Sequence, residues 1–367
     1  MRVLHVTEAP GGGVMSSVLA MVEATPGVDH HLAYWPLRQH RSTGDDWSQT
    51  LSSVTRLPLD PVRLALSLRR LVRDLFPDVV HAHSSYAGLL VRSIGLEGPR
   101  VVYSPHCFAF ERRDVGPALG RLVTGAERRL ARHTDLVVAV SPHEVDLAAD
   151  LGHAAVSYVP NRPLVGIGPV AEHRGSEPWR IATVGRITAQ KDWRYYLHVK
   201  RYAEEQLGLD ARWEWLGAGD PAGERQLRAA GVEVSGWLPR AELVSRLGTA
   251  QTYLHTAAWE GAPVSVLEAA ALGLPLAVRA IGATTSTRVP GTAADVPGLA
   301  RLLVDLRAPE RWESASAQAS SWAARHSAAL QGDLLSAAYR DVLGLASAVA
   351  PATALDAVRA PRIEAAS

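Results

Sequence analysis

Residues 259–275 read WEGAPVSVLEAAALGLP, and they place two carboxylates eight positions apart. Glu260 lies in a turn ahead of Gly261 and Pro263, whereas Glu268 lies within an apolar helix. Eight helical positions bring a residue back near the same face after about two turns. We therefore expect both carboxylates to face one cleft. Such a pair suits a polyhydroxylated ligand, because each carboxylate accepts two or more hydroxyl hydrogen bonds.

A simpler interpretation of this segment is a helix cap followed by a glutamate on the helix surface. The apolar residues around Glu268 leave it little polar helix face, which weighs against that interpretation. The segment resembles the E-x7-E motif of retaining GT-B glycosyltransferases, in particular the glycosyltransferase 4 family, also called glycosyl transferases group 1. The match beyond the two acids is carried by Gly261, Pro263, Leu267, Ala269, Gly273 and Pro275.

This resemblance implies an α/β fold of the GT-B class, in which two Rossmann-like domains face a central cleft. It also implies that Glu260 contacts the donor sugar as a catalytic residue and that Glu268 binds the ribose. The donor would be a nucleotide-diphosphate sugar, and the acceptor a glycan, a glycolipid or a small molecule. The neighbouring donor contacts would come from Gly261, Ala262, Pro263 and Val264.

Residues 184–192 (VGRITAQKD) combine a glycine after a predicted strand with two cations. A glycine there lets the backbone turn beside a ligand, and fixed cations stabilise the charge of a departing nucleoside diphosphate. A surface turn with solvated cations is the alternative. The segment resembles the diphosphate-binding motif of the same family, which implies donor contacts for Gly185 and both donor-binding and catalytic roles for Arg186 and Lys191. Asp192 stands where the family usually has glycine, and we expect it to alter the helix start or to pair with Arg186 or Lys191.

Two shorter segments keep the order and spacing of the family. Residues 215–219 (WLGAG) resemble its strand and glycine turn near the nucleotide, and residues 235–239 (SGWLP) resemble its base-contacting loop. Plain turns also explain both segments when each is taken alone. Beyond residue 275 the match weakens. The donor contacts that these segments imply are Gly217, Trp237 and Leu238.

Three consecutive glycines, residues 11–13, separate the first predicted strand from the first predicted helix. They allow a diphosphate or an acceptor to approach the N-terminus of that helix closely. In the resembling family this loop faces the cleft from the acceptor side, and we include Gly12 and Gly13 among the donor contacts; a plain tight turn is the alternative. The segment lacks the G-x-G-x-x-G fingerprint and no clear acid ends the second strand, so we do not expect NAD or another cofactor.

Residues 78–83 (DVVHAH) match the family at the end of another predicted strand. His81 and His83 point to one side of that strand, and since no further ligand accompanies them we expect no metal site. We expect His81 to pack in the core and His83 to line the acceptor side of the cleft. The resemblance gives His106, after the next strand, a catalytic contact with the donor sugar or the reaction centre. Cys107 beside it would make a Cys-His nucleophile, but no orienting group is evident.

The length of 367 residues favours two domains, because one hydrophobic core rarely supports a chain this long. Strands alternate with helices in both halves, which predicts parallel sheets covered on both faces. Leucines at helical spacing predict one such helix over residues 61–75. The segment that follows residue 160 is rich in proline and glycine, as is typical of a linker.

We expect the following limits for the parts of the chain. An acceptor-side domain covers residues 1–166 and a donor-binding domain covers residues 176–322. Residues 315–343 are expected to be helical and to supply a C-terminal helix over 323–345 that packs back toward the first domain. The remaining tail, residues 346–367, is rich in alanine and proline, and we expect it to be disordered.

Charge and composition exclude several classes of function. A net charge of +1 draws the chain to no nucleic acid, and a single cysteine excludes an internal disulfide. No D-x-D motif occurs, so we expect no metal to hold the diphosphate. Without a signal-peptide core or a membrane-spanning run, we expect a cytoplasmic enzyme. The arginine-rich helix Leu119–Arg132 is either a core helix with a solvated face or a peripheral contact with the inner membrane face.

Together these features indicate a retaining glycosyltransferase of the hexosyltransferase type. In the resembling family the leaving phosphate helps to deprotonate the acceptor, and the resemblance implies the same front-face mechanism here. A GT-B sugar-nucleotide epimerase would share the fold and the nucleotide site but would consume no acceptor. An inactive GT-B scaffold subunit is a third hypothesis, against which the joint presence of both glutamates and both cations argues.

Overall fold

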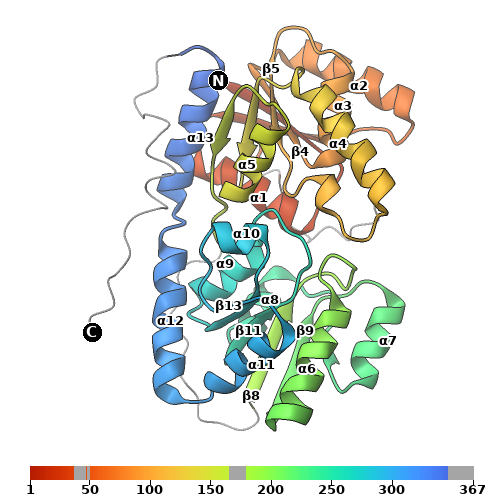
Figure 1. The fold of residues 1–367 in the computed structure, drawn as a ribbon. Coiled ribbons are helices and arrows are strands. Elements are labelled where there is room, and N and C mark those ends of the chain that lie inside the picture. The colour runs from red at the N-terminus through yellow and green to blue at the C-terminus, as the bar shows by residue number, and fades with distance from the viewer. Residues whose placement is uncertain (37–46, 48–49, 165–178, 346–367) are drawn as a thin grey trace.

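The computed structural model describes residues 1–36, 47, 50–164 and 179–345 (Figure 1). The domain limits expected at residues 166 and 176, and the tail expected to be disordered over 346–367, lie outside the described residues. None of the helices in the described part of the chain combines the length and the apolar character that a membrane span requires.

The first half forms a seven-stranded parallel sheet in the order β3-β2-β1-β4-β5-β6-β7. Successive residues of a strand point to opposite faces, so Val3 and Val79 pack on one face of the sheet while Leu4 and Val80 pack on the other. The strands are β1 (Arg2–Thr7), β2 (Asp29–Tyr34), β3 (Ser53–Arg56), β4 (Val79–His83), β5 (Arg100–Ser104), β6 (Leu136–Ala139) and β7 (Val156–Tyr158). The helices are α1 (Gly12–Ala24), α2 (Pro61–Leu75), α3 (Ser85–Ser93), the short 3-10 helix η2 (Ala109–Glu111), α4 (Pro117–Ala131) and α5 (Pro142–Asp150).

The second half forms a six-stranded parallel sheet in the order β10-β9-β8-β11-β12-β13. The strands are β8 (Trp179–Val184), β9 (Ala211–Leu216), β10 (Glu233–Val234), β11 (Thr252–His255), β12 (Leu276–Arg279) and β13 (Thr292–Ala293). The helices are α6 (Trp193–Leu207), α7 (Pro221–Ala229), α8 (Arg240–Leu247), α9 (Val264–Ala271), α10 (Gly282–Ser286), α11 (Val296–Asp305) and α12 (Pro309–Ala324). Two layers of apolar side chains cover this sheet, one of them rich in tryptophan. Both halves therefore have the parallel α/β architecture that the alternation of elements predicts.

The C-terminal segment that we expect to be helical over residues 315–343 forms two helices rather than a continuous one. Residues 315–343 are helical except at a short break, because α12 ends at Ala324 and a new helix, α13 (Ala328–Val342), begins four residues later. The Ser327 side chain accepts a hydrogen bond from the Leu330 amide at 3.1 Å and so caps the new helix. Serine favours such caps over helix interiors.

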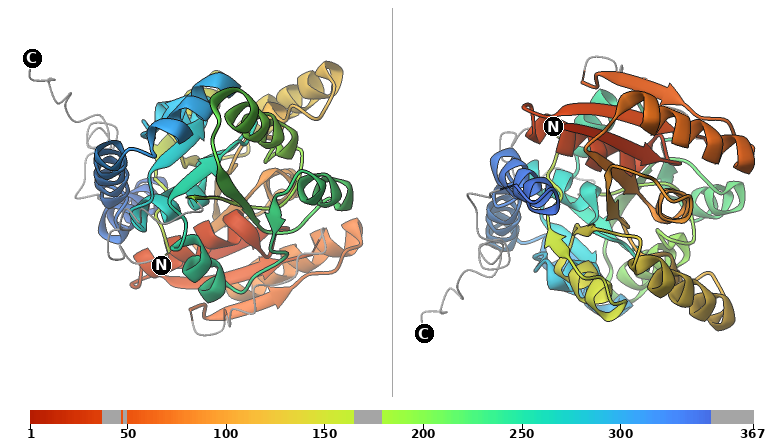
Figure 2. Two further views of the ribbon diagram at one scale, coloured as in Figure 1. Left: turned by 90° about the horizontal axis from the view of Figure 1, so that it is seen from below. Right: turned by 90° about the horizontal axis from the view of Figure 1, so that it is seen from above.

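Helix α13 returns to the first sheet. In Figures 1 and 2, α12 runs beside the second sheet and α13 continues beside the first. Leu335 and Tyr339 pack against Val3 and Met21, and the Tyr339 hydroxyl lies 2.8 Å from Nδ1 of His81. Helices α12 and α13 thus join both halves.

Candidate active site

A cavity of about 560 Å³ lies between the two halves of the chain. Its walls include the segments that follow β1, β5, β8, β9 and β11, and open α/β sheets bind their ligands at these carboxyl ends of strands. Of the site residues expected from the sequence, all except His83 line the cavity. They are Gly12, Gly13, His106, Gly185, Arg186, Lys191, Gly217, Trp237, Leu238, Glu260, Gly261, Ala262, Pro263, Val264 and Glu268.

Lys191 and Glu260 form an ion pair in the cavity wall. The Lys191 Nζ lies 2.6 Å from Oε1 of Glu260, and both side chains are largely buried. The other carboxylate oxygen of Glu260 accepts a hydrogen bond from Gln190 at 3.4 Å. This pair brings a cation and a hydroxyl acceptor together from two segments that are far apart in the sequence.

Glu268 forms the second ion pair, with Arg240 at the start of α8. The two side chains approach to 2.6 Å between Nη2 and Oε1. Burial raises the pKa of Glu268, and the nearby guanidinium opposes that shift. Sequence reasoning missed Arg240, although it directly follows the expected base-contacting loop and lines the cavity.

The glycines of the donor segments are required by close backbone contacts. A Cβ atom on Gly217 would lie 2.1 Å from the carbonyl oxygen of Gly185, and Gly217 has φ +151°. A Cβ on Gly185, at φ +149°, would meet the Lys191 side chain at 2.8 Å. The Gly217 amide also donates to Ser235 Oγ at 3.1 Å, which joins this turn to the loop that carries Trp237. The separate sequence motifs therefore form one continuous wall.

Asp192 forms a different ion pair from those expected. Its carboxylate accepts a hydrogen bond from the Tyr195 amide at 3.2 Å, which caps α6, and pairs with Arg279 Nη1 at 2.8 Å. Lys191 pairs with Glu260 instead. Asp192 has φ +51°, a left-handed conformation that favours glycine. This conformation gives a physical reason for glycine at the same position in the resembling family.

The loop that carries His106 is held by a buried carboxylate. His106 and Cys107 have φ +49° and +90°, and Glu144 accepts hydrogen bonds from the amides of Cys107 and Val140. Burial raises the pKa of Glu144 to about 7, against these two amides, which favour the charged form. A Cβ atom on Gly261 would lie 2.6 Å from the same carboxylate, so this glycine lets the two halves of the chain meet.

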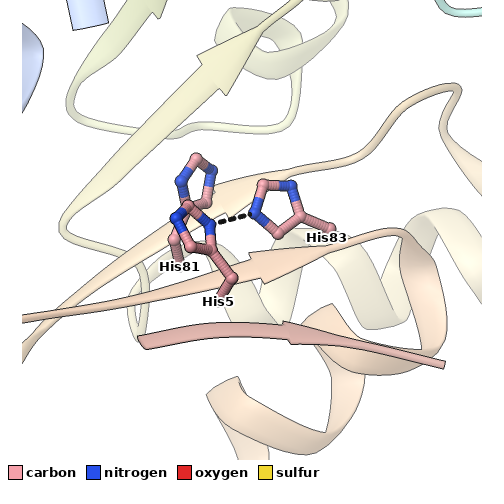
Figure 3. Close-up of side chains that lie close together, drawn as sticks. All are labelled: His5, His81 and His83. Atoms are coloured by element: carbon pink, nitrogen blue, oxygen red, sulfur yellow. Dashed lines mark hydrogen bonds between the residues drawn. The ribbon is translucent and has the colours of Figure 1, made fainter. Parts of the chain in front are cut away.

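His83 does not line the cavity, because its side chain is fully buried behind His106, with Nδ1 of His83 3.0 Å from Nε2 of His106. His5 of β1 joins His81 and His83, so a third potential ligand accompanies that pair after all (Figure 3). The strand register that sets His5 opposite His81 is not visible in the sequence. At Cys107, burial and neighbouring carboxylates raise the thiol pKa, the reverse of what a thiolate nucleophile requires.

Comparison with known families agrees with this geometry. Residues 3–162 match the glycosyl transferase 4-like domain, and residues 178–319 match glycosyl transferases group 1. The chain is a GT-B glycosyltransferase. The two matched segments correspond to the two sheets, and the cavity lies between them.

Curated relatives of this glycosyltransferase include two bacterial proteins. It is 26% identical to an uncharacterized 41.2 kDa protein in the cps region of Klebsiella pneumoniae, over 75% of this chain and 80% of that protein. It is 27% identical to the UDP-Gal:alpha-D-GlcNAc-diphosphoundecaprenol alpha-1,3-galactosyltransferase of Escherichia coli, over 58% of this chain and 60% of that enzyme.

A solved structure supports the fold of the glycosyltransferase. Sucrose-phosphate synthase from Thermosynechococcus elongatus superimposes with a TM-score of 0.76 at 14% identity, over 94% of this chain and 100% of that structure. The family and its relatives identify a hexosyltransferase that takes its sugar from a nucleotide sugar.

Proposed function

We propose that this glycosyltransferase moves a hexose from a nucleotide-diphosphate sugar to a lipid-linked glycan, with retention of anomeric configuration. The observation that carries the proposal is the meeting of two carboxylate–cation pairs in one cavity, Lys191 with Glu260 and Arg240 with Glu268. A sugar nucleotide offers hydroxyls to the carboxylates and a diphosphate to the cations. A ligand that carries both hydroxyls and a diphosphate therefore makes use of both the carboxylates and the cations of this cavity.

Each side chain of the cavity then has a separate role. Glu268 accepts the ribose hydroxyls, and Glu260 accepts hydroxyls of the donor sugar. Arg186 and Lys191 contact the diphosphate and stabilise the charge that develops as it leaves. Lys191 is held 2.6 Å from Glu260, so the leaving group and the sugar are handled by neighbouring side chains.

The reaction would proceed on one face of the sugar. The bond from the anomeric carbon to the diphosphate breaks, the acceptor oxygen bonds to the same face of that carbon, and a phosphate oxygen of the leaving group takes the acceptor proton. A covalent alternative would need a protein nucleophile. The raised pKa of Cys107 argues against this thiol in that role.

The acceptor side of the cavity favours a lipid-linked substrate. Tyr86 of α3 lines the cavity and is 45% exposed, and Leu89 on the same helix is 49% exposed. On α4, Leu119 and Leu122 are 51% and 71% exposed. The α4 leucines, which a core helix would bury, are therefore solvent-exposed, and so are Arg121, Arg128 and Arg129 of the same helix. An apolar surface with cations suits an anionic membrane.

The name of the Escherichia coli relative points to the same class of acceptor, a diphosphoundecaprenol-linked sugar, and to a uridine donor. The first experiment therefore incubates the purified protein with UDP-hexoses and a polyprenyl-diphosphate-linked sugar. Transfer with retained configuration, read from the anomeric proton coupling of the product, is the expected result.

The same experiment separates the rival functions. Isomerisation of the donor without any acceptor would identify an epimerase. No turnover of any nucleotide sugar, with no binding of nucleoside diphosphates, would favour the scaffold subunit. Product of inverted configuration would overturn the retaining mechanism while leaving glycosyl transfer intact.

A further inference from the structure

Four histidines form a continuous hydrogen-bonded chain from the interior of the first half to the cavity. His5 Nε2 lies 2.9 Å from His30 Nδ1, and His5 Nδ1 lies 2.9 Å from His83 Nε2. His83 Nδ1 lies 3.0 Å from His106 Nε2, and His106 lines the cavity. Figure 3 shows the middle of the chain, where the His5 and His83 rings face each other. The four residues come from β2, β1, β4 and the loop after β5.

Burial keeps these imidazoles neutral. It lowers the pKa of His30 and of His106 to about 4, and it lowers the pKa of His5 and His83 well below the usual value. A neutral imidazole carries one ring proton, so it donates through one nitrogen and accepts through the other. All the hydrogen bonds of such a chain must therefore point in the same direction.

Thr25 fixes that direction at the inner end. Its hydroxyl donates to the carbonyl oxygen of Met21 at 2.7 Å, so its oxygen is left to accept from His30 Nε2 at 2.8 Å. The same Nε2 lies 3.3 Å from the carbonyl oxygen of Thr25, which can only accept. His30 thus carries its proton on Nε2, and its Nδ1 accepts from His5.

The direction then propagates to the cavity. His5 donates from Nε2 and accepts at Nδ1 from His83 Nε2. His83 Nδ1 in turn accepts from His106 Nε2. His106 is left with an unprotonated Nδ1, and none of the residues that the structure describes forms a hydrogen bond with that atom.

We propose that His5, His30 and His83 are positioning residues, which hold His106 as its Nε2–H tautomer and leave its Nδ1 free to accept a hydrogen bond from a hydroxyl of the bound sugar or acceptor. The part of this inference that concerns substrate rests on the proposed function. The tautomer itself does not, because the chain from Thr25 to His106 is complete in the free protein.

A metal ion held by His5, His81 and His83 is the competing explanation of the cluster. Their ligand atoms lie within 4.8 Å of one another. However, the ring nitrogens of His81 also have partners: Ser104 Oγ donates to Val138 O, so it accepts from His81 Nε2, and Nδ1 lies 2.8 Å from the Tyr339 hydroxyl. Every ring nitrogen of the three is thus in a hydrogen bond, and a metal would have to displace several of them.

Nitrogen NMR of the unmodified protein tests the tautomer directly. Histidine-selective ¹⁵N labelling, with long-range proton–nitrogen correlation at neutral pH, distinguishes protonated from unprotonated ring nitrogens. We expect all four imidazoles to be neutral and protonated on Nε2, with His106 assigned by the loss of its signals in His106→Gln. A protonated Nδ1 on His106 would overturn the proposal, whether or not glycosyl transfer is ever observed. Stoichiometric bound metal, with shifted signals for His5, His81 and His83, would overturn it as well.

Variants of His5 test the consequence for turnover. His5→Leu cuts the chain, whereas His5→Gln can still accept from His83 and donate to His30. We expect His5→Leu to lower kcat roughly tenfold, the size expected for one lost hydrogen bond, with UDP affinity unchanged. We expect His5→Gln to recover most of that loss.

His81→Leu is the matched control, because His81 is equally buried on the neighbouring strand but lies outside the chain. We expect it to lower Tm about as much as His5→Leu does while leaving kcat and the His106 tautomer unchanged. Equal losses of kcat in His5→Leu and His81→Leu would refute a role for the direction of the hydrogen-bonded histidine chain. If His5→Leu does not fold, the NMR experiment on the unmodified protein still decides the question.

Discussion

At the scale of single residues, the two cavity glutamates differ in what their substitution leaves behind. Glu268 is buried, and losing its charge leaves Arg240 without a carboxylate partner. Losing the charge of Glu260 releases Lys191, which remains able to contact a phosphate. The two substitutions should therefore affect different parts of the donor.

We expect Glu268→Gln to weaken binding of UDP and of the intact donor by similar factors of about tenfold or more, because a buried polar group loses its partner. We expect Glu260→Gln to change UDP affinity less than about threefold while lowering turnover. Calorimetric titration with both ligands measures the difference, and Glu242→Gln, at an exposed position on α8, is the control. Equal loss of UDP affinity in both variants would refute this division of roles.

Glu144 gives a prediction for pH dependence. Burial raises its pKa in the folded protein to about 7, above the ordinary value of 4.5. Between these values the folded state binds more protons than the unfolded state, so this group makes the free energy of unfolding fall as pH rises. A shift of this size corresponds to at most about 3 kcal/mol.

Urea unfolding between pH 5 and 8 should show this fall in the unmodified protein relative to Glu144→Gln, which cannot ionise. Glu144→Gln should also lower turnover, because an amide offers only one oxygen to the two backbone amides that Glu144 holds. Parallel stability curves for the two proteins would contradict the raised pKa.

The residues that could be predicted from the sequence are those fixed by local spacing. Glu260 and Glu268 reach one cavity because the turn that carries Glu260 is followed by about one turn of α9 before Glu268. The roles of Arg240 and Glu144 could not be predicted, since the packing of separate elements determines which groups they contact. The position of His83 behind His106 could not be predicted either, because it depends on the distance between neighbouring strands.

At the scale of elements, α4 departs most from its expected environment. Its buried side chains include Glu127, which pairs with Arg92 at 2.8 Å, while Leu119 and Leu122 face solvent. Figure 1 places α2, α3 and α4 on the side of the first half opposite α13. An exposed apolar stripe with nearby arginines is the feature that suits attachment to a membrane surface.

We expect the double variant Leu119→Ser, Leu122→Ser to reduce binding to anionic phospholipid vesicles in co-sedimentation by roughly tenfold or more. Each buried CH₂ contributes about 0.8 kcal/mol, so the loss of only two of them already corresponds to about a factor of ten. Activity on a water-soluble acceptor should be unchanged. Leu345→Ser is the control, because this leucine is 55% exposed and lies three residues after the end of α13. Undiminished binding of the double variant would exclude α4 as the contact.

Elements with a strong hydrophobic periodicity were predicted well, whereas short elements were missed. Helix α2 has the limits that its leucines predict, because Asp60 caps it and Pro61 occupies the first turn. Strand β3 and helix α5 were not predicted, since they comprise only 4 and 9 residues. The break between α12 and α13 was missed for a similar reason, because a single serine cap carries little signal within a long helical pattern.

At the scale of the whole molecule, charge in the cavity comes from both halves and is largely paired. Arg112 pairs with Asp114 on the acceptor side, while Lys191 with Glu260 and Arg240 with Glu268 pair on the donor side. A diphosphate adds negative charge to these walls. Its binding must either redirect cations from their carboxylates or bring in a metal ion.

We expect the side chains to suffice, so that activity survives excess EDTA and gains nothing from added magnesium or manganese. The cations act in a partly enclosed site, where their attraction for phosphate is screened less than in water. Arg186→Ala and Lys191→Ala should each lower turnover by roughly 10²-fold or more and weaken UDP binding, which calorimetry measures. Arg301→Ala on α11, where the arginine is exposed and lies outside the cavity, is the control. Loss of activity in EDTA that a divalent metal restores would show that the cationic side chains alone do not suffice to hold the diphosphate. Unchanged UDP affinity in both alanine variants would instead remove Arg186 and Lys191 from the diphosphate site, whatever the effect of EDTA.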